Sequence, residues 1–439
     1  MKKVIIGTLI GIIAIVMMIS ETKAAYCHGK PHDGAHPNTT PLYTKPPTYV
    51  KSTKNGHYYT VGEGDDMYDV IHVYGTPYEM GYAQGQLMKE KLRVFLPAIF
   101  DYLQEEIGSN IPKNIPEWLR KYIAEYGLDV ALDMTYELVR FYTNEKIFEE
   151  MKGLADATGI DYYMIRRIHL IGELTQGKCS MMGAWGEATE AGKTIQLRAF
   201  DWDVKGPFKN YPSVTVYHPN EGNGHPFINI GFVGFVASFS GMSSEGLGIS
   251  EIGIYYPDES FGGESRIGNA FVFLLRDILQ YDQTLDDSIT RMATTRRTCD
   301  LALGVGDGKL GTFRGFAYSH DSFQVLDDIN AKPKNDSWHP PIKNVYYLGM
   351  DWLCPPYNLR LGEQIKKYHG KINPEVMMQQ VVPMTTTGNL QVSIYDLTEQ
   401  VAYVSYARGD NEDGPAYAYD RRYIRIDTKQ LWNVTKPAL

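Results

Sequence analysis

The stretch Cys179-Ser-Met-Met-Gly-Ala-Trp-Gly186, followed by Arg198-Ala-Phe-Asp201, marks the point where the chain changes character. Upstream, from Pro77 to about Leu174, apolar residues recur at three- and four-residue steps, which is typical of amphipathic helices. Downstream, short β-rich runs alternate with Gly, Asp, Asn and Pro. The sequence therefore predicts an α+β protein with a helical first part and a strand-rich second part that begins at Cys179.

Residues 26–50, rich in Pro, His, Thr and Gly, predict a poorly ordered leader. A strand is expected at 66–74, and Asp161 is expected to cap the last helix of the first part, which runs to Leu174. A second helical block covers 268–292. The strands predicted downstream are 194–200, 213–218, 227–239, 247–254, 301–305, 313–318, 344–348, 391–395 and 401–406.

Charge and the N-terminal segment narrow the class of protein. The net charge is −9 without a long basic run, which argues against nucleic-acid binding. Lys2 and Lys3, an apolar run from Val4 to Ile19, and small residues up to Ala24 predict a signal peptide over 1–24. The alternative is an uncleaved anchor, but the run is shorter than the ~20 residues of a spanning helix. We therefore expect a secreted or lysosomal protein without a stable membrane span, and three N-glycosylation sequons, at Asn38, Asn335 and Asn433, agree with that route.

Common cofactor and metal motifs are not found. The four cysteines, Cys27, Cys179, Cys299 and Cys354, have wide spacings that do not suggest zinc. Residues 306–311 fit Gly-x-Gly-x-x-Gly, but no helix follows them, and Asp307-Gly308 is a hairpin turn signal. The chain has neither a Gly-x-Ser-x-Gly elbow nor a His-Glu-x-x-His pair. No cofactor and no metal are expected.

A cysteine at a newly exposed N-terminus can attack an amide without help from a histidine. Its own α-amine, with a pKa of ~7.7–8.0, can act as the general base for its thiol. Arg198 could stabilise the thiolate, and Asp201 could orient the amine, if Cys179 opens one strand and Arg198 and Asp201 end the next. The structural alternative is a buried cysteine beside an ion pair at a strand end.

Four motifs in order resemble the N-terminal-nucleophile cysteine hydrolases that cut linear amides. The group includes acid ceramidase, N-acylethanolamine acid amidase and isopenicillin N acyltransferase, with bile salt hydrolases further off. The resemblance covers about 73–407. Its motifs are Gly75–Gly85, Gly153–Gly159, Cys179-Ser180 with Arg198-x-x-Asp201, and Gly234–Glu251.

The resemblance implies a four-layer αββα sandwich and a chain that cuts itself between Lys178 and Cys179, into a mainly helical subunit, 25–178, and a catalytic subunit, 179–439. It implies that Cys179 is the nucleophile and, through its amine, the base, with Arg198 and Asp201 as neighbours. The remaining implied site residues are the backbone amide near Ser243 as an oxyanion donor, Glu251, and Arg360 as a later arginine.

The sequence departs from the family pattern at two asparagines. Ser243 replaces the Asn of Gly-Met-Asn, and the segment Tyr347–Asp351 lacks the Asn of the later Thr-Asn. The second oxyanion donor is therefore open, with Asn358 and Asn389 as candidates. A family-like disulfide would join Cys27 to Cys354 and hold the two subunits together, and Cys299 is expected to be a buried thiol.

These features together predict an amidohydrolase that forms an acyl thioester on Cys179 and then hydrolyses it. The expected substrate is a small acyl amide, with an N-acylated lipid such as a ceramide or an N-acylethanolamine favoured. Three alternatives stay open: an acyltransferase of the penicillin type, a phospholipase B-like esterase, and a binding protein with a weak or inactive site.

Overall fold

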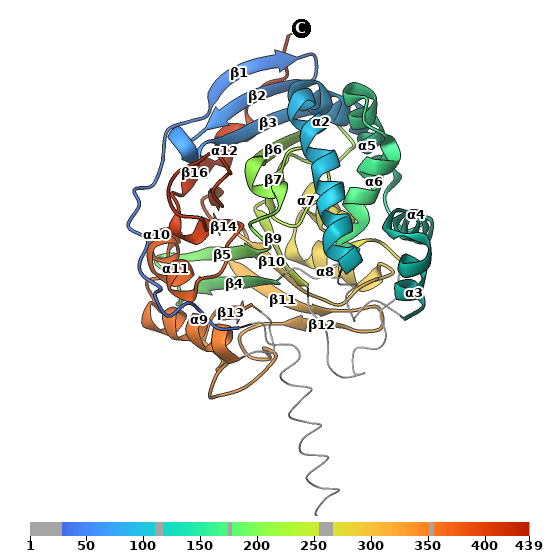
Figure 1. Ribbon diagram of the computed structural model, residues 1–439. Coiled ribbons are helices and arrows are strands. Elements are labelled where there is room, and N and C mark those ends of the chain that lie inside the picture. The colour runs from blue at the N-terminus through green and yellow to red at the C-terminus, as the bar shows by residue number, and fades with distance from the viewer. Residues whose placement is uncertain (1–28, 110–116, 174–177, 254–266, 351–354, 439) are drawn as a thin grey trace, which may run out of the picture.

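Two β-sheets form the centre of the protein in the computed structural model, which describes residues 29–109, 117–173, 178–253, 267–350 and 355–438 (Figure 1). The large sheet has the order β1 (Thr48–Thr53), β2 (Gly56–Val61), β3 (Tyr68–Gly75), β6 (Pro212–Pro219), β7 (Phe227–Phe232), β8 (Gly241–Ser243), β9 (Leu247–Gly253), β10 (Leu301–Asp307), β11 (Thr312–Tyr318) and β12 (Phe323–Leu326). The small sheet has the order β13 (Val345–Leu348), β4 (Lys178–Gly186), β5 (Gly192–Asp201), β14 (Gln391–Asp396), β15 (Val401–Tyr406) and β16 (Ile424–Asp427).

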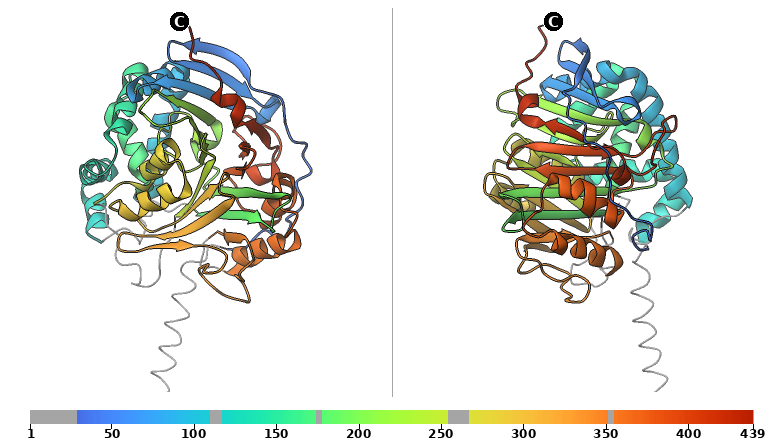
Figure 2. Two further views of the ribbon diagram at one scale, coloured as in Figure 1. Left: turned by 180° about the vertical axis from the view of Figure 1, so that it is seen from behind. Right: turned by 90° about the vertical axis from the view of Figure 1, so that its left-hand side faces the viewer.

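Helices cover the outer face of each sheet, as the two views of Figure 2 show. The layer on the large sheet contains α2 (Pro77–Ser109), α5 (Glu145–Thr158), α6 (Tyr162–Leu170), α7 (Phe271–Tyr281) and α8 (Leu285–Thr294), with α3 (Glu117–Tyr126) and α4 (Leu128–Val139) beside it. The layer on the small sheet contains α9 (Pro355–Lys367), α10 (Pro374–Val376), the π-helical turn Met377–Val381 and α11 (Val382–Thr385). The structure is thus a four-layer αββα sandwich, as the resemblance implied.

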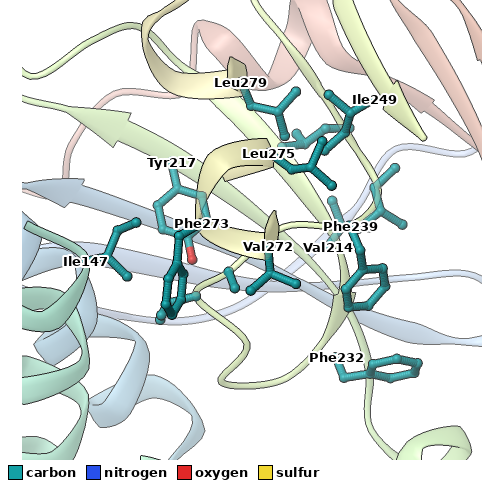
Figure 3. Close-up of a cluster of buried hydrophobic side chains, with 14 of the residues drawn as sticks. Ile147, Val214, Tyr217, Phe232, Phe239, Ile249, Val272, Phe273, Leu275 and Leu279 are labelled. Carbon is teal, nitrogen blue, oxygen red and sulfur yellow. The ribbon is translucent and has the colours of Figure 1, made fainter. Parts of the chain in front are cut away.

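Three apolar interfaces hold these layers together, because each buried strand presents alternate side chains to opposite faces. Val272, Phe273, Leu275 and Leu279 of α7 pack against the large sheet (Figure 3). On the small sheet, Met182 and Ala184 face the helices, whereas Cys179 and Met181 face the large sheet. The sheets approach closely at Gly183, where an added Cβ would lie 1.9 Å from Cγ of Phe313.

The residues before Lys178 do not form a separate helical unit. They supply β1, β2 and β3, and β3 pairs in parallel with β6, which lies beyond Cys179. The other paired strands of the described chain run antiparallel. The two predicted subunits therefore share one sheet.

The predicted disordered leader is wrong from residue 29 onward. Asn38 is 5% exposed, and its amide nitrogen donates to the carbonyl oxygens of Tyr419 and Arg421, at 3.1 and 2.8 Å. Tyr43 forms a parallel bridge with Ile424 of β16. The Pro- and Thr-rich composition hid this segment because it is held by single contacts to the second half of the chain and not by regular pairing of its own.

The C-terminal residues lie across β2 and β3, near β1 at the top of Figure 1. Tyr74 donates to the carbonyl of Val434 at 2.9 Å, and His57 Nε2 lies 3.0 Å from the carbonyl of Thr435. Beneath them His72 Nδ1 lies 3.1 Å from His218 Nε2, and the ring of Tyr74 stacks on His218 with centroids 4.3 Å apart.

Most predicted elements are confirmed. Asp161 caps α6 by accepting from the amide of Tyr163 at 3.0 Å, and residues 306–311 form the β10–β11 hairpin. The expected strand 227–239 ends at Phe232, because residues 233–240 leave the sheet as a loop. Within the residues that the structure describes, no helix combines the length and the apolarity that crossing a membrane requires.

Candidate active site

Cys179 lies near the start of β4, and its side chain points into the space between the two sheets. It pairs with Phe200 of β5, and Lys178 pairs with Asp201. The sequence therefore folds as the nucleophile hypothesis requires, with Cys179 opening one strand and Arg198 and Asp201 near the end of its antiparallel neighbour. The thiol is free and 0% exposed, whereas Lys178 is exposed.

Arg198 and Glu251 form an ion pair between the sheets. Arg198 Nη2 donates to Glu251 Oε1 of β9, and the guanidinium lies 4.3 Å from the ring centroid of Phe200 and 5.2 Å from that of Phe239. Its Nε and Nη1 are buried, with no hydrogen-bond acceptor within the described chain. The guanidinium of Arg198 is thus fixed in place and keeps two nitrogens free to donate, so it could stabilise a thiolate or an oxyanion.

Asp201 is held by a loop that the sequence did not reveal. Its Oδ2 accepts from Thr387 Oγ1 and from the amide of Gly388, both at 2.8 Å, and its Oδ1 accepts from the amide of Asn389 at 3.0 Å. A carboxylate offers about four acceptor positions. One position on Oδ1 is therefore left for a further donor, such as an amine at Cys179.

Thr387 also connects Asp201 to the residue after the nucleophile. Thr387 Oγ1 lies 2.6 Å from Ser180 Oγ. A hydroxyl has one proton, and the carboxylate can only accept, so Ser180 donates to Thr387 and Thr387 donates to Asp201. All three side chains are buried on the face of the small sheet opposite to the Cys179 thiol.

Burial shifts the pKa values of the ionisable groups around Cys179. Burial raises the pKa of the Cys179 thiol, and Arg198 and a hydrogen bond from the Asp201 backbone only partly oppose this. Burial also raises the pKa of Asp201 to about 6, despite its three hydrogen bonds. Burial raises the pKa of Glu251 as well, and Arg198 opposes that shift. In this arrangement burial therefore favours the protonated form of the Cys179 thiol.

An apolar cavity of about 90 Å³ adjoins this group. Residues from both sides of the Lys178–Cys179 bond line it, and Glu251 and Phe200 lie at its border with the site. Seven of the seventeen lining residues are Phe or Trp, namely Phe200, Trp202, Phe208, Phe232, Phe235, Phe239 and Phe271. Its volume is below the ~300–1,000 Å³ of typical ligand pockets, and its lining suits a small apolar group.

Two predicted site residues are not brought to Cys179. Ser243 ends β8, and its Oγ accepts from Leu247 at 3.3 Å in the turn to β9. The neighbouring residue Met242 pairs with Gly248 of β9, and Gly248 lies against the side chain of Gln196 in the small sheet. Gln196 in turn pairs with Gly183 of β4. Four residues of strand separate Gly183 from Cys179, or ~13 Å. The structure therefore places the turn at Ser243 along the sheet from Cys179, and the backbone amide near Ser243 stays a prediction as an oxyanion donor.

Arg360 is also placed away from the nucleophile. It lies on α9, on the outer face of the small sheet, with its side chain 37% exposed. Its Nε is 3.7 Å from Glu363 Oε2, one helical turn away. The predicted later arginine of the site is thus a surface residue here, because the helix presents it to solvent and not to the space between the sheets.

The two candidate asparagines lie at the Cys179 end of the small sheet. Asn358 is buried and accepts from the amide of Gly349 at 2.8 Å, next to β13. Asn389 accepts from the amide of Trp202 at 2.9 Å. Both side-chain oxygens thus accept hydrogen bonds from backbone amides near this end of the sheet. Neither residue is assigned as the second oxyanion donor.

Of the other three cysteines, the described part of the chain includes only Cys299. Cys299 is buried, and its sulfur lies 3.6 Å from Glu173 Oε1. Cys27 and Cys354, the expected disulfide partners, lie outside the described residues. Among the residues that are described, no group of three or more His, Cys, Asp or Glu side chains is arranged to hold a metal ion.

Two curated proteins of Dictyostelium discoideum are similar over most of the chain. The protein dcd1A is 33% identical over 443 residues, which covers 96% of this chain and 98% of that protein. The protein dcd1B is 32% identical over 414 residues, which covers 90% of this chain and 81% of that protein. No family model matches the chain.

Solved structures show weaker similarity. A Caenorhabditis elegans ortholog of N-acylethanolamine-hydrolyzing acid amidase aligns with a TM-score of 0.38 at 14% identity, over 50% of this chain and 93% of that chain. A mutant of conjugated bile acid hydrolase from Clostridium perfringens gives 0.37 at 13%, over 57% and 93%. Penicillin V acylase from Agrobacterium tumefaciens gives 0.35 at 13%, over 57% and 87%. TM-scores this low do not assign a function to the chain.

Proposed function

Because the chain belongs to the family of the Dictyostelium proteins dcd1A and dcd1B, and because it places Cys179 beside Arg198, Glu251 and Asp201, we propose that it is a self-processing cysteine amidohydrolase. The observation that carries the proposal is the register of β4 against β5. It sets Asp201 opposite Lys178, one residue pair from Cys179 and Phe200, which supports a role for the carboxylate near the amine that cleavage would create.

The first step is cleavage of the chain by its own thiol. The sulfur of Cys179 attacks the carbonyl carbon of Lys178, the C–N bond between the two residues breaks, and the thiol proton passes to the new amine. Water then hydrolyses the thioester, which leaves a carboxylate on Lys178 and a free thiol on Cys179. Arg198, through its unused donors, is positioned to stabilise negative charge on the sulfur.

The second reaction uses the amine that the first one made. The α-amine takes the thiol proton, the thiolate attacks the amide carbonyl of the substrate, and the departing amine receives a proton from the ammonium group. Water hydrolyses the acyl thioester. Asp201 orients the amine through its remaining acceptor position, and Glu251 keeps the guanidinium of Arg198 in place.

The lining of the cavity supports a proposal for the substrate class. Its aromatic residues, and a described lining in which Glu251 is the one charged side chain at neutral pH, favour an apolar acyl group. We therefore propose an N-acylated lipid, of the ceramide or N-acylethanolamine type, as the substrate.

Intact mass and N-terminal sequencing of the purified protein test self-processing. Wild type should give two chains, the second beginning Cys-Ser-Met-Met, and Cys179→Ala should remain a single chain. Cys299→Ala is a matched control, because it removes a buried thiol that lies outside this site. An active mature protein with Cys179 inside an uncut chain would refute the proposal.

Turnover is tested separately on the mature protein. Fluorogenic N-acyl amides with short, aromatic and long acyl groups should be hydrolysed, and an acyl group should be detectable on Cys179 by mass spectrometry after rapid acid quenching. Parallel ester substrates and added acceptor amines separate an amidase from an esterase and from an acyltransferase. Self-cleaved protein that forms no acyl thioester with any of these substrates would contradict the amidohydrolase assignment.

A further inference from the structure

The loop 233–240, between β7 and β8, connects the cavity to the nucleophile group. Phe235 and Phe239 line the cavity, and Phe239 also packs against the guanidinium of Arg198. The position of this loop therefore sets both the shape of the cavity and the stacking on Arg198.

His169, at the end of α6, contacts this loop by a hydrogen bond whose direction is fixed. Its Nδ1 lies 2.7 Å from the carbonyl oxygen of Ile165, which can only accept, so Nδ1 carries the proton. Nε2 is then an acceptor, and the backbone amide of Val236 donates to it at 2.9 Å. The imidazole also stacks on Phe235 with centroids 4.8 Å apart.

The other contacts of the loop do not change charge near neutral pH. Arg276 of α7 donates to the carbonyl of Val236, and Asn229 donates to the carbonyls of Phe235 and Ala237, at 2.9 and 2.8 Å. The amide of Ser238 donates to the carbonyl of Val272 at 3.1 Å. Of these residues His169 alone can gain a proton in mild acid, and it alone precedes Cys179 in sequence.

We propose that His169 is a positioning residue that holds the loop 233–240 in place while its imidazole is neutral, and releases the loop when the imidazole takes a second proton. Protonated Nε2 would point its N–H at the N–H of Val236, and two donors cannot share a hydrogen bond. The release of the loop depends only on the hydrogen bonds of His169, whereas its effect on catalysis rests on the proposed function.

The charged groups around His169 do not compensate a second proton. Arg276, on α7, is positive, and Glu150 of α5 is already paired with it at 2.8 Å. Glu251, across the cavity, is paired with Arg198, and Glu173 accepts from the amide of Phe271 at 3.0 Å. Arg166, on the same helix, pairs with Asp133 at 2.7 Å. Burial, with a contribution from Arg276, lowers the pKa of His169 to about 4, so the loop is held at neutral pH and freed as the pH falls toward that value.

Hydrogen exchange of the peptide that contains residues 233–240 tests this without any turnover step. Exchange is measured by mass spectrometry from about pH 7 to pH 4 and corrected for the intrinsic pH dependence of amide exchange. In wild type the protection of the Val236 amide should fall by about tenfold or more across this range, because its acceptor is lost. Peptides from β10 should keep their protection, which separates loop release from global unfolding.

The variants assign the effect to His169. In His169→Gln the side-chain oxygen can accept from Val236 but cannot titrate, so protection should become independent of pH. In His169→Leu protection should be low at every pH, and the exposed His36→Gln should match wild type. Constant protection in wild type across the range, or a His169→Gln profile that follows wild type, would overturn the inference.

The pH dependence of exchange in wild type alone can contradict the proposal. A variant that fails to fold therefore does not leave the release of the loop untested. A chain that proves not to cut itself would refute the proposed function and would leave this result standing. If turnover is found, its decline in acid should be weaker in His169→Gln than in wild type.

Discussion

Arg198 of β5 and Glu251 of β9 form an ion pair across the space between the two sheets, with 0% and 7% of their side chains exposed. Neither residue forms an ion pair within its own sheet in the described chain. Each is therefore held in position by the other, and the guanidinium that faces the Cys179 thiol depends on a carboxylate from the opposite layer.

Removal of one member of this pair should destabilise the fold strongly. Arg198→Ala leaves Glu251 buried without a partner, at a cost of about 3–5 kcal/mol in free energy of unfolding. Urea denaturation in a Cys179→Ala background measures it. The double change Arg198→Met with Glu251→Leu should recover much of the loss, because no buried charge is left. A loss below about 1 kcal/mol for Arg198→Ala would show that the pair is not structurally important.

Asp201→Asn should block self-cleavage and leave a folded chain. The amide keeps the size of the side chain but cannot stabilise by charge the positive charge that develops on the nitrogen of Cys179 as the Lys178–Cys179 bond breaks. Since burial raises the pKa of Asp201 to about 6, the carboxylate form predominates above that pH, and cleavage in wild type should slow as the pH falls through it. Time courses on denaturing gels measure both effects. The exposed Asp203→Asn is the control, and cleavage of Asp201→Asn at the wild-type rate would contradict the assigned role.

Thr387 should matter through its hydroxyl. Thr387→Val removes the donor to Asp201 and the acceptor for Ser180 without changing the volume, and leaves buried polar groups unpaired. We expect slower cleavage and a stability loss of about 1–3 kcal/mol. Thr387→Ser, which keeps the hydroxyl, should restore most of both. Equal behaviour of the Val and Ser variants would mean that the methyl group, and not the hydroxyl, is what the site requires.

Asn38 should carry no glycan although it lies in a sequon. Its amide nitrogen, where a glycan would attach, is buried between two backbone carbonyls. Glycopeptide mapping of protein from a eukaryotic host should find residue 38 unmodified, whereas Asn433 is exposed. Asn38→Asp should lower the melting temperature, because a carboxylate would face two carbonyl oxygens. Full glycosylation at Asn38 in folded protein would show that the segment packs differently.

The buried pair His72 and His218 should weaken the fold in acid. Burial lowers the pKa of His218 to about 4, below the ~6.5 of an unfolded histidine. Between these two pH values the unfolded chain binds a proton at this residue more readily than the folded chain does. The contribution of His218 to stability is therefore fully present above about pH 6.5 and is lost as the pH falls toward about 4. The loss approaches about 3 kcal/mol for this residue. Denaturation midpoints of wild type and His218→Gln should therefore converge as the pH is lowered, and parallel curves would contradict the assignment.

Predictions from sequence succeed where a pattern is local. The change of periodicity at Cys179 locates β4, and turn residues locate β5, β6, β10 and β11 to within a few residues. The expected position of Arg198 and Asp201 near the end of the strand beside Cys179 is confirmed, and their roles stay predictions. The αββα order comes from the resemblance, since periodicity alone does not state which sheet covers which.

The failures concern contacts between distant segments. The role expected of Ser243 rests on a short motif, but the β8–β9 hairpin puts this residue at the opposite end from Glu251. Thr387 and Gly388 show only a turn signal before a strand, and nothing in their own composition indicates the carboxylate that they bind. Phe239 falls within a predicted strand, because apolar residues in a loop that covers a cavity look like strand residues in sequence.

The parallel pairing of β3 with β6 also constrains the order of events in biosynthesis. If residues 179–439 were separated from residues 1–178 before folding, β6 would lack its partner β3 and would become an edge strand. Its free backbone groups could then pair with other chains, which is a route to aggregation. The sheet must therefore close first. Cleavage at Lys178 would then report that both halves have met, and the cut protein would be kinetically trapped as a complex that its separated pieces could not readily rebuild.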